Sequence, residues 1–151
     1  MNSRSSTVAS DSCIFCAIAS GRAPAEVVYE DGHTMAFMDI NPATKGHVLV
    51  VPKRHSRDLF DVGEEDALHV MCTVLRVAQG IEASLKPDGV NLMHATRRAA
   101  FQSVYHYHVH VIPRWWDDGI TPLWRHAPGD LDELREVGAR IRSALEATAT
   151  S

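Results

Sequence analysis

The chain has 151 residues, of which 45% are hydrophobic and 23% are charged, and these fractions indicate a globular protein rather than a disordered or fibrous one. Its 15 lysines and arginines against 19 acidic residues give a formal charge of −4, which disfavours binding to duplex nucleic acid. No apolar run is long enough to span a membrane, and we expect a cytoplasmic protein without a membrane partner.

The N-terminal part of the chain predicts a flexible polar tail over residues 1–11, followed by a single domain over residues 12–151. A short helix is expected from Ser12 to about Gly21, and it carries Cys13 and Cys16. The only other cysteine is Cys72, and so small a number in a cytosolic chain argues against a disulfide framework.

The next segments predict three strands. Val27–Glu30 and Met35–Asp39 are joined through Asp31-Gly32, which is a good hairpin signal. Gly46–Pro52 is a short apolar strand that ends at its proline, and the basic residues Lys53-Arg54-His55 follow it.

A long helix is predicted from Asp61 to Leu85, because apolar residues recur at helical spacing in two rows. We expect one row to pack on a sheet and the other to form a dimer contact, since two rows make a wide buried arc. The rows are Val70, Val74, Val77 and Ile81, and Leu68, Met71, Leu75 and Ala78.

The remaining segments predict a strand over Val90–Ala95 and a strong strand within Phe101–Arg114, then a loop and a last helix from Leu131. Asp130 can cap this helix, with Glu133 as the reciprocal residue of a capping box. We therefore expect an α+β domain with a mainly antiparallel sheet, a long helix packed on it and a C-terminal helix.

Three histidines alternate with apolar residues within the last predicted strand. Since alternate side chains of a strand point to opposite faces, His106, His108 and His110 share one face. Three imidazoles in one row have no packing rationale, and they indicate either a metal site or a catalytic row.

The pair Cys13-x-x-Cys16 has the spacing of zinc ligands. Two alternatives are a pair of small buried residues and a redox pair, although the redox motif normally lies at a βαβ junction, which this segment does not predict. A closed zinc site needs two more ligands, and histidine is the usual completion. No histidines follow at zinc-finger spacing, so the completing ligands would be distant in the sequence.

Four blocks together resemble the histidine triad family, which is named for a His-φ-His-φ-His-φ-φ segment, where φ is an apolar residue. These blocks are Cys13–Cys16, Phe37–Pro42, Gly46–His55 and Gln102–Arg114, and they occur in the family's order. The resemblance implies the small α+β histidine triad fold, usually as a homodimer. It also implies hydrolysis or transfer of nucleotides attached through the α-phosphorus, because that is what members of the family do.

The resemblance also implies a role for each matching residue. His108 matches the middle histidine, which is the nucleophile. Ser103 and His110 match phosphate-binding positions, with Gln102 beside them, and Asp39 and Ile40 match the segment that holds ribose and base. In the zinc-binding branch the matching metal ligands are Cys13, Cys16, His55 and His106, and a closed four-ligand site makes the zinc structural.

The chain departs from the family pattern before the histidines. Phe101 stands where many members have glycine, and the preceding loop contains Arg97 and Arg98. The two arginines are either contacts for extra phosphates of a longer substrate or ordinary solvated charges. The expected substrate is thus a purine nucleoside phosphoramidate or a dinucleoside polyphosphate. A nucleotidyl transferase or phosphorylase, and a regulatory nucleotide-binding protein with little turnover, are the alternatives.

Overall fold

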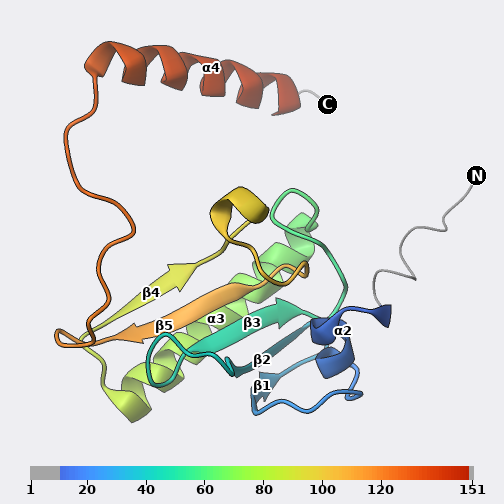
Figure 1. Ribbon diagram of the computed structural model, residues 1–151. Coiled ribbons are helices and arrows are strands. Elements are labelled where there is room, and N and C mark those ends of the chain that lie inside the picture. The colour runs from blue at the N-terminus through green and yellow to red at the C-terminus, as the bar shows by residue number, and fades with distance from the viewer. Residues whose placement is uncertain (1–10, 150–151) are drawn as a thin grey trace, which may run out of the picture. The chain divides into compact units, whose positions relative to one another are not determined.

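Short runs of β-branched and apolar residues form a five-stranded sheet in the computed structural model, which describes residues 11–149 (Figure 1). Every neighbouring pair is antiparallel, in the order β1-β2-β3-β5-β4, so the predicted antiparallel sheet is confirmed. Residues 1–10 of the predicted tail lie outside the described residues. The strands are β1 (Val27–Glu30), β2 (Thr34–Met38), β3 (Val48–Pro52), β4 (Gly89–Met93) and β5 (Val109–Arg114).

The β1–β2 hairpin is stabilised by the side chain at its turn. Asp31 Oδ1 accepts hydrogen bonds from the backbone N–H groups of His33 and Thr34, both at 2.8 Å. Aspartate is favoured at turns because its carboxylate satisfies backbone donors two and three residues later. The hairpin that the sequence predicts is therefore confirmed, with Glu30 paired to Met35.

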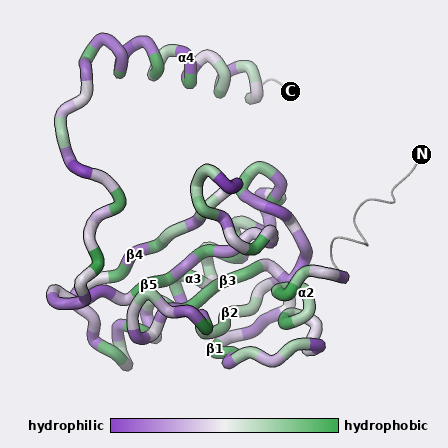
Figure 2. The backbone as a smooth tube through the Cα atoms, viewed as in Figure 1, coloured by the Kyte–Doolittle hydropathy of each residue, from purple (hydrophilic) through white to green (hydrophobic). Residues whose placement is uncertain are grey.

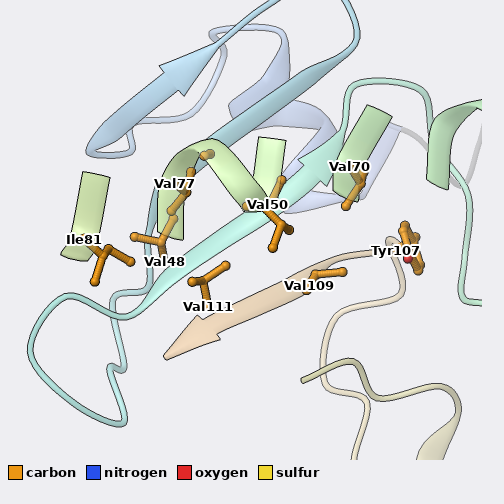
Figure 3. Packing of buried hydrophobic residues seen from close by; sticks show 10 residues of the cluster. Val48, Val50, Val70, Val77, Ile81, Tyr107, Val109 and Val111 are labelled. Atoms are coloured by element: carbon orange, nitrogen blue, oxygen red, sulfur yellow. The ribbon is translucent and has the colours of Figure 1, made fainter. Parts of the chain in front are cut away.

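The long helix α3 (Glu64–Leu85) packs one of its two apolar rows on the sheet. Val70, Val74, Val77 and Ile81 are buried against Val48 and Val50 of β3 and Val109 and Val111 of β5 (Figure 3). The helix begins three residues later than predicted, and its first turn holds three acidic residues, which favour a helix N-terminus. Within residues 11–118 the other row is uncovered at Leu68 and Leu75, which are 61% and 58% exposed, whereas its last member, Ala78, packs against the same cluster.

The opposite face of the sheet is covered by the short helix α2 (Ile14–Ala19). Phe15 and Ile18 of this helix pack in a second apolar cluster with Leu49 and Val51 of β3. The strand β3 is thus buried on both faces, which explains its continuous apolar run in the sequence and in Figure 2. The functional histidines predicted from the sequence lie on this α2 side.

The contacts divide the chain into one unit that ends at Asp118 and a second that begins at Gly119. The second unit contains helix α4 (Leu131–Ala149), whose Asp130 accepts hydrogen bonds from the N–H groups of Asp132 and Glu133 at 2.9 Å, as predicted for a cap. A single domain over residues 12–151 stays a prediction. No helix among residues 11–149 has the length and apolarity that crossing a membrane requires.

Candidate active site and metal cluster

The histidine segment is only partly a strand. β5 begins at Val109, so the expectation that the strand within Phe101–Arg114 already includes residues 105–108 is wrong. The reason is that β3 ends at Pro52, and the N–H of Tyr107 instead donates to the oxygen of Ser56 at 2.7 Å.

The alternation of side chains nevertheless persists beyond the strand. Tyr107 and Val109 are buried in the cluster under α3. His106 and His108 lie on the other side, with ring centroids 6.0 and 5.2 Å from that of Phe15. The predicted separation of histidines from apolar residues therefore holds for these positions, whereas Tyr105 is 47% exposed.

Side chains distant in the sequence meet in a cluster of two thiols and two imidazoles: Cys13, Cys16, His55 and His106. The Nδ1 atom of His106 lies 3.4 Å from Cys13 Sγ, 3.5 Å from Cys16 Sγ and 3.3 Å from His55 Nδ1. A second contact of 3.3 Å joins Cys16 Sγ to His55 Nδ1. These are the four residues that the family resemblance implies as metal ligands.

The cluster has the dimensions of a tetrahedral zinc site. Bonds of about 2.3 Å to sulfur and about 2.05 Å to nitrogen would separate sulfur from nitrogen by about 3.5 Å, and nitrogen from nitrogen by about 3.3 Å. The observed contacts match both separations. His106 Nε2 also donates to the oxygen of Pro52 at 2.7 Å, which leaves the Nδ1 lone pair directed into the cluster. The residues therefore fit a zinc ion.

The thiol of Cys16 needs a cation to ionise at pH 7. Burial, together with the neighbouring Cys13, raises the pKa of Cys16 to about 12. Burial also lowers the pKa of His106 to about 4, so its imidazole is neutral at pH 7, as a metal ligand must be. The N–H of Cys16 already points at Cys13 Sγ, at 3.4 Å.

The tautomer of His108 follows from its one hydrogen bond to the backbone. Its Nδ1 lies 2.6 Å from the oxygen of His106, and because a carbonyl only accepts, Nδ1 carries the proton. Burial lowers the pKa of His108, partly opposed by this hydrogen bond, and the ring is therefore neutral at pH 7. The second nitrogen, Nε2, then holds a lone pair, which is the atom a nucleophile requires.

A second cluster that meets distance criteria for a metal consists of Asp39, His47 and His110. Its hydrogen bonds argue against a metal site, because the N–H of Ala43 donates to His47 Nδ1 at 3.0 Å. In the neutral ring the proton is then on Nε2, which lies 2.9 Å from His110 Nδ1 and 3.5 Å from Asp39 Oδ2. A metal would have to displace this proton.

The hydrogen bond from His47 also determines the tautomer of His110. Since His47 Nε2 donates to His110 Nδ1, the proton of His110 is on Nε2, where it is available to an anion. Burial and the neighbouring His108 lower the pKa of His110 to about 4, and burial lowers that of His47 despite Asp39. The sequence indicates at most that His47, in the family's third block, lies near the nucleotide, and it does not indicate the contact with His110.

The sequence reasoning also missed His94. Its Nδ1 donates to the oxygen of His108 at 2.7 Å, and its Nε2 accepts from Thr96 Oγ1 at 2.6 Å. Both ring nitrogens therefore make hydrogen bonds within the protein, and His94 holds the backbone of His108 in place. The sequence gives no signal of this role, because His94 and His108 are 14 residues apart.

The remaining predicted residues occupy different environments. Gln102 is 5% exposed, and its amide bonds the N–H of Arg97 and the oxygens of Arg57 and Val104. Its polar atoms are thus engaged within the protein, so it shapes the loop. Ser103 is exposed, and Ile40 is 90% exposed, as expected for groups that would meet a ligand.

The loop before Gln102 is strained at the positions where the chain departs from the family pattern. Arg97 and Phe101 have φ values of 68° and 66°, which glycine adopts at little cost. The Arg97 guanidinium carbon lies 4.6 Å from the ring centroid of Phe60, and Phe101 is 90% exposed. The amide of Gln102 links two loops by hydrogen bonds to Arg97 and Arg57. Arg97 and the exposed rings of Phe60 and Phe101 lie on these loops.

Comparison with known proteins agrees with these features. The family model described as the HIT domain matches residues 20–115. A HIT family protein from Bacillus anthracis is 37% identical and superposes with a TM-score of 0.82, over 89% of this chain and 97% of that one. A zinc-bound histidine triad family protein from Mycobacterium smegmatis is 41% identical, with a TM-score of 0.71 over 89% of this chain and 99% of that one.

A relative of known activity is also similar. The adenosine 5′-monophosphoramidase hnt1 of Schizosaccharomyces pombe is 32% identical over 89% of this chain and 99% of its own length. The sheet, the packed long helix and these similarities confirm the predicted α+β histidine triad fold. With the HIT domain model matching most of the first unit, the chain belongs to the HIT family.

Proposed function

We propose that this protein is a nucleotide hydrolase that acts at the α-phosphorus through a covalent nucleotidyl intermediate on His108. The observation that carries the proposal is the tautomer of His108, whose Nδ1–H is bound to the oxygen of His106 while Nε2 is left as a lone pair. The similarity to an adenosine monophosphoramidase supports the same reaction class.

The reaction proceeds in two displacements. His108 Nε2 attacks the α-phosphorus, a P–N bond to His108 forms, and the bond from phosphorus to the leaving group breaks. A water then attacks the same phosphorus, the P–N bond breaks, and the mononucleotide is released. The leaving group takes up a proton from solvent in the first displacement, and the attacking water returns one in the second. Each step moves negative charge onto the non-bridging oxygens, which need hydrogen-bond donors.

Two donors are available for that charge. His110 offers Nε2–H, because His47 occupies its other nitrogen, and Ser103 offers a hydroxyl from an exposed position. Asp39 and Ile40 are the residues we assign to ribose and base. Gln102 contributes by holding the loop in place rather than by binding the nucleotide, since its amide is engaged within the protein.

We assign a structural zinc to Cys13, Cys16, His55 and His106. Four protein ligands leave no open position for a water or substrate, so the ion supplies rigidity and no acid catalysis. The carbonyl of His106 holds the proton of His108, so a rigid His106 also orients the nucleophile. The similarity to a zinc-bound family member supports this assignment.

Two substrate classes remain candidates. Nucleoside phosphoramidates are favoured by the similarity to the monophosphoramidase. Dinucleoside polyphosphates are favoured by the loop, where the exposed Arg97 and Arg98 lie beside the exposed ring of Phe101. Guanidinium groups bind phosphate in a bidentate manner, and an exposed ring can stack on a second base.

One experiment separates the hydrolase from a transferase or phosphorylase and from a binding protein. Adenosine 5′-phosphoramidate is incubated with the zinc-loaded protein, with and without inorganic phosphate, and the products are resolved. A hydrolase releases AMP in both conditions, and a phosphorylase releases ADP only with phosphate. Tight AMP binding without any product would contradict the hydrolase and favour a regulatory protein.

We also propose a homodimer in the cytoplasm. In the uncovered row of α3, the side chains of Leu68, Met71 and Leu75 are each exposed by 44% or more, and none of them belongs to an apolar cluster of residues 11–118. Apolar rows of this kind are characteristic of self-association.

A further inference from the structure

A groove lies on the side of the sheet away from the catalytic histidines. It has a volume of about 440 Å³ and runs between β1 and the C-terminal half of α3. Its floor is apolar and is formed by Met38, Val48, Val77 and Ile81. None of the residues assigned to the nucleotide or to zinc lines it. The volume falls within the range of about 300–1,000 Å³ that is typical of small-molecule sites.

Small residues on α3 keep the groove open. Gly80 and Ser84 lie one turn apart and face it. A Cβ atom added at Gly80 would meet no atom within 4 Å, so close packing does not require glycine there. Glycine inside a helix costs about 1 kcal/mol relative to alanine. The helix therefore has glycine, the residue least favourable to helix formation apart from proline, at a position where a larger side chain would narrow the groove.

Two cations and no acidic residue line the groove. These cations are Lys45 and Arg76, and the ion pairs of residues 11–149 include neither of them. Arg76 is held by Tyr29, because Nη1 donates to its hydroxyl at 3.2 Å and the guanidinium lies 5.7 Å from its ring centroid. A positioned guanidinium above an apolar floor is complementary to an anion with an apolar body.

We propose that this groove binds an aliphatic monocarboxylate, with its carboxylate paired to Arg76 beside Tyr29 and its chain on Val77 and Ile81. The apolar floor provides the burial of the chain, and the guanidinium of Arg76 selects the sign of the head group. The proposal is independent of the proposed function, because the groove shares no residue with the candidate active site.

The experiment is a calorimetric titration of the full zinc-loaded chain with decanoate, below the concentration at which micelles form. Decanol and decyltrimethylammonium have the same chain with a neutral and a cationic head. We expect saturable binding of decanoate, at least about 10-fold tighter than either counterpart. Equal affinity for the three amphiphiles, or no saturable binding of decanoate, would overturn the proposal.

Matched variants locate the site. Gly80→Leu fills the groove and should weaken decanoate binding at least about 10-fold, whereas Gly80→Ala leaves most of the space and should bind nearly as the wild type does. Arg76→Met should remove most of the preference over decanol, and Lys53→Met, which removes a cation outside the groove, should retain it. Unchanged binding by a folded Gly80→Leu variant would place the ligand elsewhere. A change in oligomeric mass with this variant, without decanoate binding to the wild type, would assign the groove to a second copy instead.

Discussion

The Nδ1 atom of His108 lies 2.6 Å from the backbone oxygen of His106, whose own side chain belongs to the Cys13–Cys16–His55 cluster. One residue therefore contributes its ring to the metal cluster and its carbonyl to the tautomer of the candidate nucleophile. The two histidines are two residues apart, yet they should respond to substitution in different ways.

His108→Ala should lower turnover at least about 1,000-fold and leave folding, zinc content and AMP affinity near those of the wild type, because the lost group forms the covalent bond. His106→Ala should instead lose metal affinity and thermal stability, since metal binding and folding are coupled. Turnover, metal analysis and thermal unfolding of both variants test this. Near-normal hydrolysis by His108→Ala would exclude the covalent mechanism.

The metal cluster predicts one zinc per chain. Because the pKa of Cys16 is raised to about 12 without a cation, binding of zinc at pH 7 must displace the proton of this thiol. Titration of the apoprotein in weak buffer should therefore acidify the solution, with about one equivalent of zinc bound. Cys72→Ser, which alters an exposed cysteine outside the cluster, should behave as the wild type. Fully reactive thiols and no metal in protein purified without a tag would contradict the site.

His47 is expected to act on catalysis through His110. His47→Phe removes the donor to His110 Nδ1, so the His110 proton is no longer held on Nε2. We expect kcat to fall on the order of 10-fold or more, with a smaller change in KM, because the donor acts on charge that develops in the transition state. His47→Gln, which keeps a donor amide at similar reach, should recover part of kcat. Equal losses in both variants, accompanied by lower melting temperatures, would indicate a purely structural role.

The uncovered row of α3 predicts a dimer in solution. Light scattering at micromolar concentration should return about twice the mass of one chain. Leu75→Glu places a charge in the row and should yield a monomer, whereas Val27→Glu on β1, a residue that is also exposed, should not. A wild-type monomer at these concentrations would defeat the proposal.

The β1–β2 turn predicts an acid-sensitive contribution to folding. Partial burial raises the pKa of Asp31, but hydrogen bonds from His33, Thr34 and Tyr29 outweigh it and lower that pKa to about 2, from an ordinary value of 3.8. Because the folded-state pKa is the lower one, the contribution is present above about pH 4 and is lost as the pH falls towards 2.

The corresponding measurement is urea unfolding between pH 2 and 6. Asp31→Asn keeps an acceptor but cannot titrate, so its stability should vary less with pH over this interval than that of the wild type. The difference should be on the order of 1 kcal/mol, since the carboxylate is partly solvated. Identical pH profiles for the two proteins would exclude the assignment.

The sequence by itself determined the elements whose signals are local. The Asp31-Gly32 hairpin, the apolar run of β3 and the inner row of α3 follow from turn chemistry and periodicity, and all three lie where they were expected. The alternation of histidines with apolar residues also predicted that they would occupy opposite sides, because side-chain direction depends only on the local backbone. The resemblance of four blocks to the histidine triad family then indicated which residues form the candidate active site and the candidate metal site.

Only the tertiary structure decided what depends on contacts between distant segments. The strand expected within Phe101–Arg114 starts only at Val109, because Pro52 ends the neighbouring strand and the oxygen of Ser56 accepts the hydrogen bond from the N–H of Tyr107. The proton positions on His47, His94, His108 and His110 depend on which groups the fold places within 3 Å of each ring nitrogen. Spacing along the chain carries no information about these partners, since hydrogen bonds form between neighbours in space.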